Sequence, residues 1–182
     1  MEEYGIDGVF MQRFVAEIRN KSGKFHFNKV LDSAMESANR HSRAICVMYD
    51  LSGMHAGDEE ILIKDIKELA ERHSLFNHDD NPSYLYHNGK PLVTVWGVGF
   101  NDGRKYGYKE ADKIITSLKE MGFSVMLGVP TQWRTLDGDT INDPVLHALI
   151  RRCDIIMPWF VGRYNENTYT MYQPRIDADI KW

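Results

Sequence analysis

Five short runs of almost continuously apolar residues constrain this chain more than any other feature of its sequence. They cover residues 8–14, 44–50, 92–100, 124–130 and 154–160. Strands that are apolar on both sides are typical of a parallel sheet whose two faces are covered. Parallel strands also need long return connections, and the gaps between the runs leave room for helices. The pattern therefore predicts an α/β fold.

The gaps carry the spacing of amphipathic helices. Asn28 and Asp58 are each expected to cap the start of a helix, and Asp143 followed by Pro144 predicts another start. The apolar positions of the four helices form these sets: Val30, Leu31, Ala34, Met35 and Ala38; Leu62, Ile63, Ile66, Leu69 and Ala70; Ala111, Ile114, Ile115 and Leu118; Val145, Leu146, Leu149 and Ile150. Each set lies on one helix face, which predicts that this face is buried.

A barrel and an open doubly wound sheet both fit this order. The repeating units span roughly 30 to 50 residues, which is close to the repeat of an eight-unit barrel of about 250 residues. We therefore expect residues 1–182 to form a single incomplete domain, a partial (β/α)8 TIM barrel with five to six βα units. Residues 1–5 resemble the last turn of a helix and the pattern after Pro174 resembles an interrupted one, so the first and last units are expected to be missing. Asn88-Gly89 predicts an additional hairpin.

Composition excludes several classes of function. The net charge of −4 and the pI near 6.0 provide no basic surface for nucleic acid, and no run of about 18 apolar residues could span a membrane. Cys46 and Cys153 fall in or beside apolar runs, so neither a disulfide nor a zinc site is predicted. We expect no metal and no cofactor. Localisation stays open, and would be periplasmic or secreted if a signal peptide belongs to the full-length protein.

The residues at the ends of the predicted strands are polar or aromatic. In both candidate folds a ligand binds beyond the C-terminal ends of the strands. The candidate binding residues there are Gln12, Arg13, Asp50, Trp96, Trp133, Arg134, Asp137, Trp159 and Arg163. Sugar rings stack on flat aromatic surfaces, and their hydroxyls suit the planar groups of arginine and carboxylate. The set therefore predicts a carbohydrate-binding rim.

A structural interpretation of the same residues stands beside this one. In it the tryptophans close the mouth of the barrel as core residues. The arginines Arg13, Arg134 and Arg163 then form ion pairs with Asp50, Asp102 or Asp137.

Two stretches late in the chain, residues 127–134 (LGVPTQWR) and 157–164 (MPWFVGRY), resemble the bacterial branch of glycoside hydrolase families 71 and 99. Residues 172–179, 8–14 and 90–97 fit the same pattern, and the resemblance is closer to family 99, the endo-α-mannosidases and endo-α-mannanases. It covers nearly the whole chain. The resemblance implies a (β/α)8 barrel that hydrolyses bonds within a sugar chain, with α-mannan as the expected substrate, α-glucan as the second option and retention in the mannan-cleaving branch.

The resemblance also implies that the catalytic carboxylates are glutamates of a late strand-end loop, and no such motif occurs before Trp182. It therefore assigns binding residues alone, the set above without Asp137. Hydrolysis needs two carboxyl groups about 5 Å apart, or about 6.5 to 9.5 Å apart for inversion. Asp50 and Asp137 are poor candidates because an exposed aspartate lacks the burial that raises the pKa of a proton donor. Catalytic residues stay unassigned, and residues 1–182 alone are expected to be inactive.

Two other functions compete with hydrolysis. One is a non-catalytic carbohydrate-binding protein that keeps the same rim. The other is an enzyme for phosphorylated metabolites, which the acidic balance and the lack of a glycine-rich phosphate loop disfavour. The expected partner is therefore a carbohydrate. An unclosed barrel also exposes two sheet edges, so we expect self-association through them unless the 182 residues are part of something larger.

Overall fold

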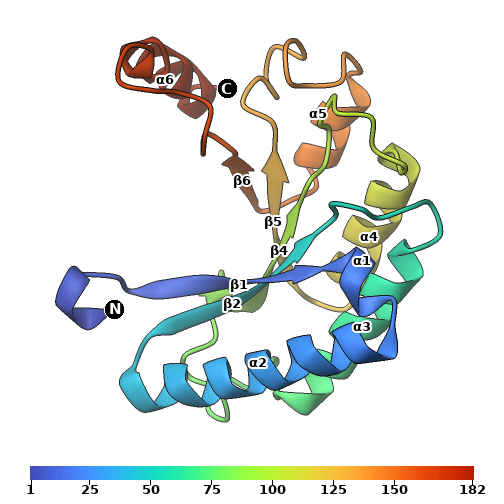
Figure 1. The fold of residues 1–182 in the computed structure, drawn as a ribbon, viewed down its shortest axis with the longest axis vertical. Helices are drawn as coiled ribbons and strands as arrows, with labels where there is room; N and C mark the ends of the chain where they lie inside the picture. The colour runs from blue at the N-terminus through green and yellow to red at the C-terminus, as the bar shows by residue number, and fades with distance from the viewer.

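Five parallel strands cross the sheet in the order in which they occur along the chain (Figure 1). They are β1 (Gly8–Phe14), β2 (Ala44–Asp50), β4 (Lys90–Trp96), β5 (Ser124–Val129) and β6 (Ile155–Pro158). The computed structural model describes all residues from 1 to 182, and the short strand β3 (Tyr86–His87) pairs antiparallel with β4. The predicted α/β class and all five predicted strands are confirmed.

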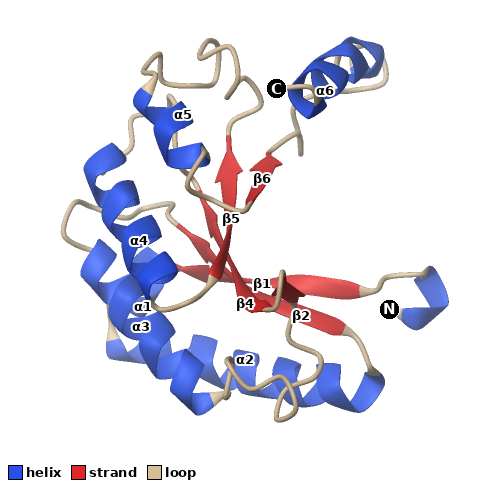
Figure 2. Cartoon of the chain, turned by 180° about the vertical axis from the view of Figure 1, so that it is seen from behind, coloured by secondary structure: helices blue, strands red, loops and turns tan.

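Helices α1 to α5 connect these strands and lie along one face of the sheet, and α6 follows the last strand (Figure 2). They are α1 (Val15–Ile18), α2 (Lys21–His41), α3 (Glu59–Arg72), α4 (Tyr108–Glu120), α5 (Val145–Ile150) and α6 (Gln173–Ile180), with the 3-10 turns η1 (Glu2–Tyr4) and η2 (Tyr169–Met171). Figure 2 shows α1 to α5 on the same side of the curved sheet, whereas the other side is open toward the N-terminal segment and α6.

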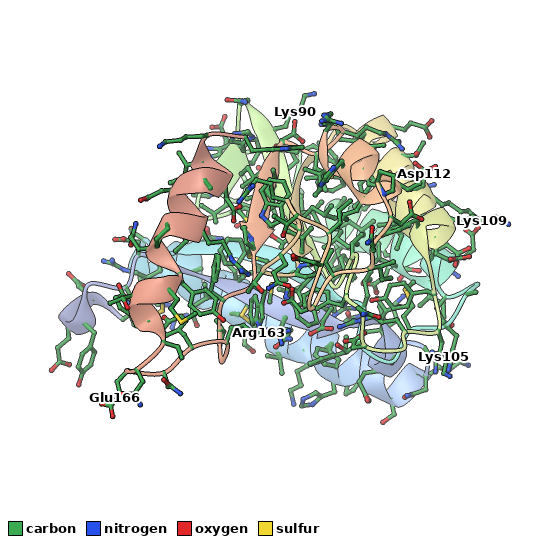
Figure 3. All side chains as sticks on the ribbon, turned by 90° about the horizontal axis from the view of Figure 1, so that it is seen from above. Lys90, Lys105, Lys109, Asp112, Arg163 and Glu166 are labelled. Atoms are coloured by element: carbon green, nitrogen blue, oxygen red, sulfur yellow. The ribbon has the colours of Figure 1, made fainter.

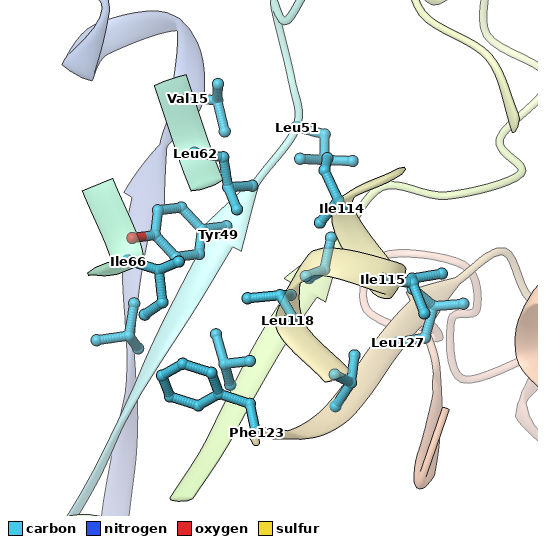
Figure 4. Packing of buried hydrophobic residues seen from close by; sticks show 14 of the residues in the cluster. Val15, Tyr49, Leu51, Leu62, Ile66, Ile114, Ile115, Leu118, Phe123 and Leu127 are labelled. Carbon is cyan, nitrogen blue, oxygen red and sulfur yellow. The ribbon is translucent and has the colours of Figure 1, made fainter. Parts of the chain in front are cut away.

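The core lies between the helices and one face of the sheet. Side chains alternate between faces along a strand, and the odd-numbered residues of β2, β4 and β5, except Pro91, belong to the large buried cluster. Figure 4 shows Tyr49 beside Ile66 of α3 and Leu127 beside Ile115 of α4. Burying one such side chain is worth about 1.5–3 kcal/mol. The predicted apolar faces of α3, α4 and α5 supply the other half of this core, except that Val145, expected on the buried face of α5, is 44% exposed.

The opposite, concave face of the sheet has no helix over it. Strand register aligns Gln12, Met48, Thr94, Met126 and Ile155 in one row across this face. A second row, one layer nearer the C-terminal ends of the strands, contains Asp50, Trp96, Gly128 and Met157. The first row therefore mixes apolar side chains with Gln12 and Thr94, and the row nearer the C-terminal rim adds a carboxylate and an indole.

The predicted hairpin before the third main strand is confirmed. Asn88 and Gly89 have φ angles of 50° and 75°, and they connect β3 to β4. Two successive positive φ angles are what a tight hairpin turn between twisted strands requires. The third strand ends at Trp96 rather than at residue 100, because Gly97 takes a φ of 118° and leaves the strand direction.

The predicted cap at Asn28 is wrong. Helix α2 begins seven residues earlier, at Lys21, where the side chain of Asn20 accepts a hydrogen bond from the backbone nitrogen of Gly23 at 2.7 Å. Asn28 lies inside the helix, and its side-chain oxygen accepts from Arg13 Nη2 at 2.7 Å. Val30, which was expected on the buried face of α2, is 42% exposed. The inward residues Leu31, Met35 and Ala38 are buried as predicted.

No helix combines the length and the apolar composition needed to cross a lipid bilayer.

Both edges of the sheet, β1 and β6, carry unpaired backbone groups, so we expect the isolated 182-residue polypeptide to self-associate. Phe10 of β1 is 39% exposed, and Phe10→Lys should weaken association because edge charges oppose strand pairing. Sedimentation velocity at two protein concentrations measures this. Phe25→Lys, at a position of α2 that is 70% exposed, is the matched control and should leave association unchanged. A single monomeric species at both concentrations would contradict the expectation.

Candidate functional site

The loops that follow the strands gather at one end of the molecule. In Figure 3, Lys90 at the start of β4 lies at one side, whereas Lys105, Arg163 and Glu166 lie toward the opposite side. These last three residues belong to the connections after β4 and β6. The C-terminal rim of the sheet, where α/β proteins place their ligands, is therefore formed by these loops.

Asp50 and Gln12 form a polar pair on the concave face. Asp50 Oδ2 accepts a hydrogen bond from Gln12 Nε2 at 2.5 Å, and Asp50 Oδ1 accepts from the backbone nitrogen of Ser52 at 2.7 Å. Asp50 is buried, whereas Gln12 is exposed. The structure therefore brings two of the predicted residues together and fixes the carboxylate at the end of β2.

Trp96 and Trp159 form an aromatic pair beside Asp50. Their ring centroids are 5.3 Å apart with an interplanar angle of 69°, and Trp96 is the register partner of Asp50 on the neighbouring strand. The indole Nε1 of Trp96 is buried without a hydrogen-bond partner. Gly128 provides the room for this indole, because a Cβ atom at this position would lie 2.6 Å from Trp96 Cδ1. Trp96 and Trp159, two of the three predicted tryptophans, thus belong to the rim.

Arg104 and Tyr106 also belong to the rim, and they were not predicted. The Arg104 guanidinium lies 5.1 Å from the ring centroid of Trp96 and donates from Nη1 to the Tyr106 hydroxyl at 2.8 Å. Tyr106 in turn donates to the carbonyl oxygen of Gly97 at 2.7 Å. Burial raises the pKa of Tyr106, so the hydroxyl keeps the proton that this bond needs. The alternation of Asp102, Arg104 and Tyr106 directly after a strand end was the available signal.

Asp139 joins the loop after β5 to the loop after β6. Its carboxylate accepts from the backbone nitrogen of Thr131 at 3.0 Å, from the Thr131 hydroxyl at 2.8 Å and from the backbone nitrogen of Gln132 at 3.1 Å. Arg163 Nη2 lies 3.6 Å from the same carboxylate, and this arginine is 39% exposed. Arg163 is therefore placed at the rim with part of its guanidinium surface free.

Arg13 does not join the rim. It is 3% exposed and makes two hydrogen bonds to the buried carboxylate of Asp65 on α3, at 2.6 and 2.7 Å. Tyr49 donates to the same carboxylate at 2.6 Å. Arg13 follows Gln12 in β1, and neighbouring strand residues point to opposite faces. Its assignment as a ligand-facing residue is therefore corrected to a structural role between the sheet and the helices.

Trp133, Arg134 and Asp137 are also placed differently from the expectation. Trp133 is 2% exposed and packs edge-on against Trp182 with centroids 4.9 Å apart. Arg134 Nε donates to Asp179 at 2.8 Å, which ties the loop after β5 to α6. Asp137 is exposed and accepts from the hydroxyl of Thr135 in its own loop at 2.7 Å. None of the three contacts the Asp50 and Trp96 group.

The structural interpretation correctly predicted that the three arginines pair with carboxylates, but it named the wrong aspartates. All three arginines lie beside carboxylates, but these belong to Asp65, Asp179 and Asp139 rather than to the expected Asp50, Asp102 or Asp137. Trp133 matches the core role that this interpretation gave to the tryptophans. Trp96 and Trp159, which are half-buried, keep surface at the rim.

A cavity of about 220 Å³ opens beside the Arg104 and Tyr106 side chains, and Gly53, Met54 and Asp102 also line it. A larger cavity, of about 370 Å³, lies at the opposite ends of the strands between β1 and the end of α2. This second cavity is lined by Glu2, His41 and Arg43 together with apolar residues, and no tryptophan or tyrosine lines it. No group of three or more His, Cys, Asp or Glu side chains is arranged to hold a metal ion.

Comparison of the chain with protein-family models, with curated proteins and with solved structures finds no match in any of the three. The geometry of the rim therefore carries the functional argument.

The corrected role of Arg13 can be tested by stability. Arg13→Met removes both guanidinium hydrogen bonds from the buried carboxylate of Asp65 and leaves it with the more distant Lys24 Nζ, at 3.5 Å, so the free energy of unfolding should fall by about 3 kcal/mol. Urea denaturation followed by circular dichroism measures the change. Arg40→Met is the matched control, since Arg40 pairs with Glu36 on the exposed surface of α2 and should change stability by less than about 0.5 kcal/mol. Equal effects of the two substitutions would contradict the assignment.

Proposed function

We propose that residues 1–182 are part of a (β/α)8 barrel whose C-terminal rim binds a carbohydrate chain. The strand order supports the barrel, because it follows chain order without the reversal that defines a doubly wound sheet. The position of the helices supports it too, since α1 to α5 lie on one face of the sheet (Figure 2). In a barrel the other face lines the interior, which fits a concave face where Met48, Met126 and Ile155 are in one row with Gln12 and Thr94.

One observation supports a carbohydrate as the class of ligand. Asp50 and Trp96 are register partners on the concave face, Gln12 is bonded to Asp50, and Trp159 packs on Trp96. A carboxylate and a carboxamide thus lie next to two indole rings at the ends of neighbouring strands. A sugar ring has an apolar face for stacking and vicinal hydroxyls for planar polar groups. The combination favours a carbohydrate over a purely apolar ligand.

The proposed reaction is hydrolysis of glycosidic bonds within a polysaccharide or oligosaccharide, with α-mannan as the first substrate class and α-glucan as the second. Its support is the resemblance of residues 127–134 and 157–164 to glycoside hydrolase families 71 and 99. We assign no catalytic pair within residues 1–182. The carboxylates at the rim are engaged: Asp50 by Gln12 and Ser52, Asp102 by Arg104, and Asp139 by Thr131 and Gln132.

A non-catalytic carbohydrate-binding protein is the second candidate. The engagement of Asp50, Asp102 and Asp139 favours it, because a general acid or nucleophile must be free to approach the scissile bond. Reducing ends released from α-mannan by the protein would support hydrolysis. Binding of α-mannan oligosaccharides without such release would support the second candidate.

Calorimetric titration with α-mannotetraose, and separately with maltotetraose, tests the proposed binding. Trp159→Ala should weaken binding at least fivefold, about 1 kcal/mol, because the sugar loses a stacking surface. Phe76→Ala is the matched control. Phe76 is 48% exposed and packs on Phe123, which directly precedes β5 at the opposite ends of the strands from the rim, so binding should be unchanged. Absence of binding to both sugars, or equal losses in the two variants, would contradict the proposal.

A further inference from the structure

The side chain of Arg104 is held by its neighbours and is not free to bind a ligand. Its side chain is only 11% exposed, and its guanidinium carbon lies 5.1 Å from the ring centroid of Trp96 and 5.0 Å from that of Phe100. A planar guanidinium stacks on aromatic rings in a way that the ammonium group of lysine does not. Arg104 therefore contacts the aromatic part of the rim along its flat surface.

Two residues fix the orientation of this guanidinium by hydrogen bonds. Asp102 accepts from Nε and from Nη2, both at 2.9 Å, and the Tyr106 hydroxyl accepts from Nη1 at 2.8 Å. Tyr106 is itself held by its bond to the Gly97 carbonyl oxygen. A Cβ atom at Gly97 would lie 2.9 Å from Arg104 Nη1, so the glycine leaves the space that the guanidinium occupies. The N–H groups at the edge of the Arg104 guanidinium are thus used in the hydrogen bonds that hold this side chain in place.

We infer that Arg104 is a positioning residue, which holds the indole of Trp96 in the orientation where it meets Trp159 and a bound sugar. This inference rests on the proposed function of the same rim. Phe100 supports Trp96 from a second direction, with ring centroids 4.8 Å apart. Arg104 acts through Trp96 and does not bind the sugar itself.

A double-mutant cycle on Arg104 and Trp96 tests the inference, with α-mannotetraose as the titrated probe. Arg104→Met and Arg104→Lys should each weaken binding about fivefold or more, since neither side chain has a planar guanidinium that can stack on an aromatic ring and donate two hydrogen bonds to one carboxylate. In the Trp96→Ala background the same substitutions should have almost no further effect. The near-ultraviolet circular dichroism of the unliganded protein should change in both Arg104 variants, because the paired indoles change orientation.

Two further variants accompany the cycle. Lys109→Met is the matched control, since Lys109 is exposed in the first turn of α4, outside the rim loops, and it should leave both binding and the dichroism signal unchanged. Tyr106→Phe removes a single hydroxyl from the anchor of Arg104, and it should give a smaller loss of the same kind. If the Arg104 variants do not fold, Tyr106→Phe decides the question by the same two measurements.

The outcomes separate this inference from the proposed function. If Trp96→Ala weakens binding but the Arg104 variants do not, the positioning role is overturned and the rim remains a sugar site. If Arg104→Met weakens binding equally with and without Trp96, the arginine contacts the sugar directly and the positioning role is again overturned. If no sugar binds to the unsubstituted protein, the proposed function fails, and an unchanged dichroism signal in Arg104→Met then overturns the positioning role as well.

Discussion

Burial of one face of the parallel sheet against α3 and α4 is the interaction on which the rest of this structure depends. It uses one of every two residues in β2, β4 and β5, and it fixes the register and direction of these strands. Because side chains alternate, the remaining residues must point to the concave face. Asp50 and Trp96 lie side by side there as a direct result of that register.

Much of the fold could be predicted from the sequence because its signals are local. Continuous apolar runs, the Asn88-Gly89 turn and the apolar stripes of α3 and α4 each act within a few residues. The start of α2 could not be located, because two asparagines compete for the role of cap. The bond from Gly23 to Asn20 decides it, while Asn28 is used by Arg13 from a distant strand.

The candidate site was predicted less well, and the reason is the direction of side chains. Gln12 and Arg13 were both assigned to the rim, although adjacent strand residues face opposite ways. Trp133 and Arg134 follow a strand end as expected, but both are used in contacts with the C-terminal segment, Trp133 with Trp182 and Arg134 with Asp179 of α6. Which carboxylate accepts from each arginine depends on packing between elements that are far apart in sequence, so spacing along the chain could not identify it.

Gly128 has a consequence for the shape of this rim. Lacking a side chain, it lets the indole of β4 lean across β5 and meet the indole that follows β6. Two rings from strands that are not neighbours thereby meet edge to face. A larger residue at position 128 would press on both the ring and the Cα atom of Trp96, so a change at a position with no chemistry of its own would be felt in ligand recognition.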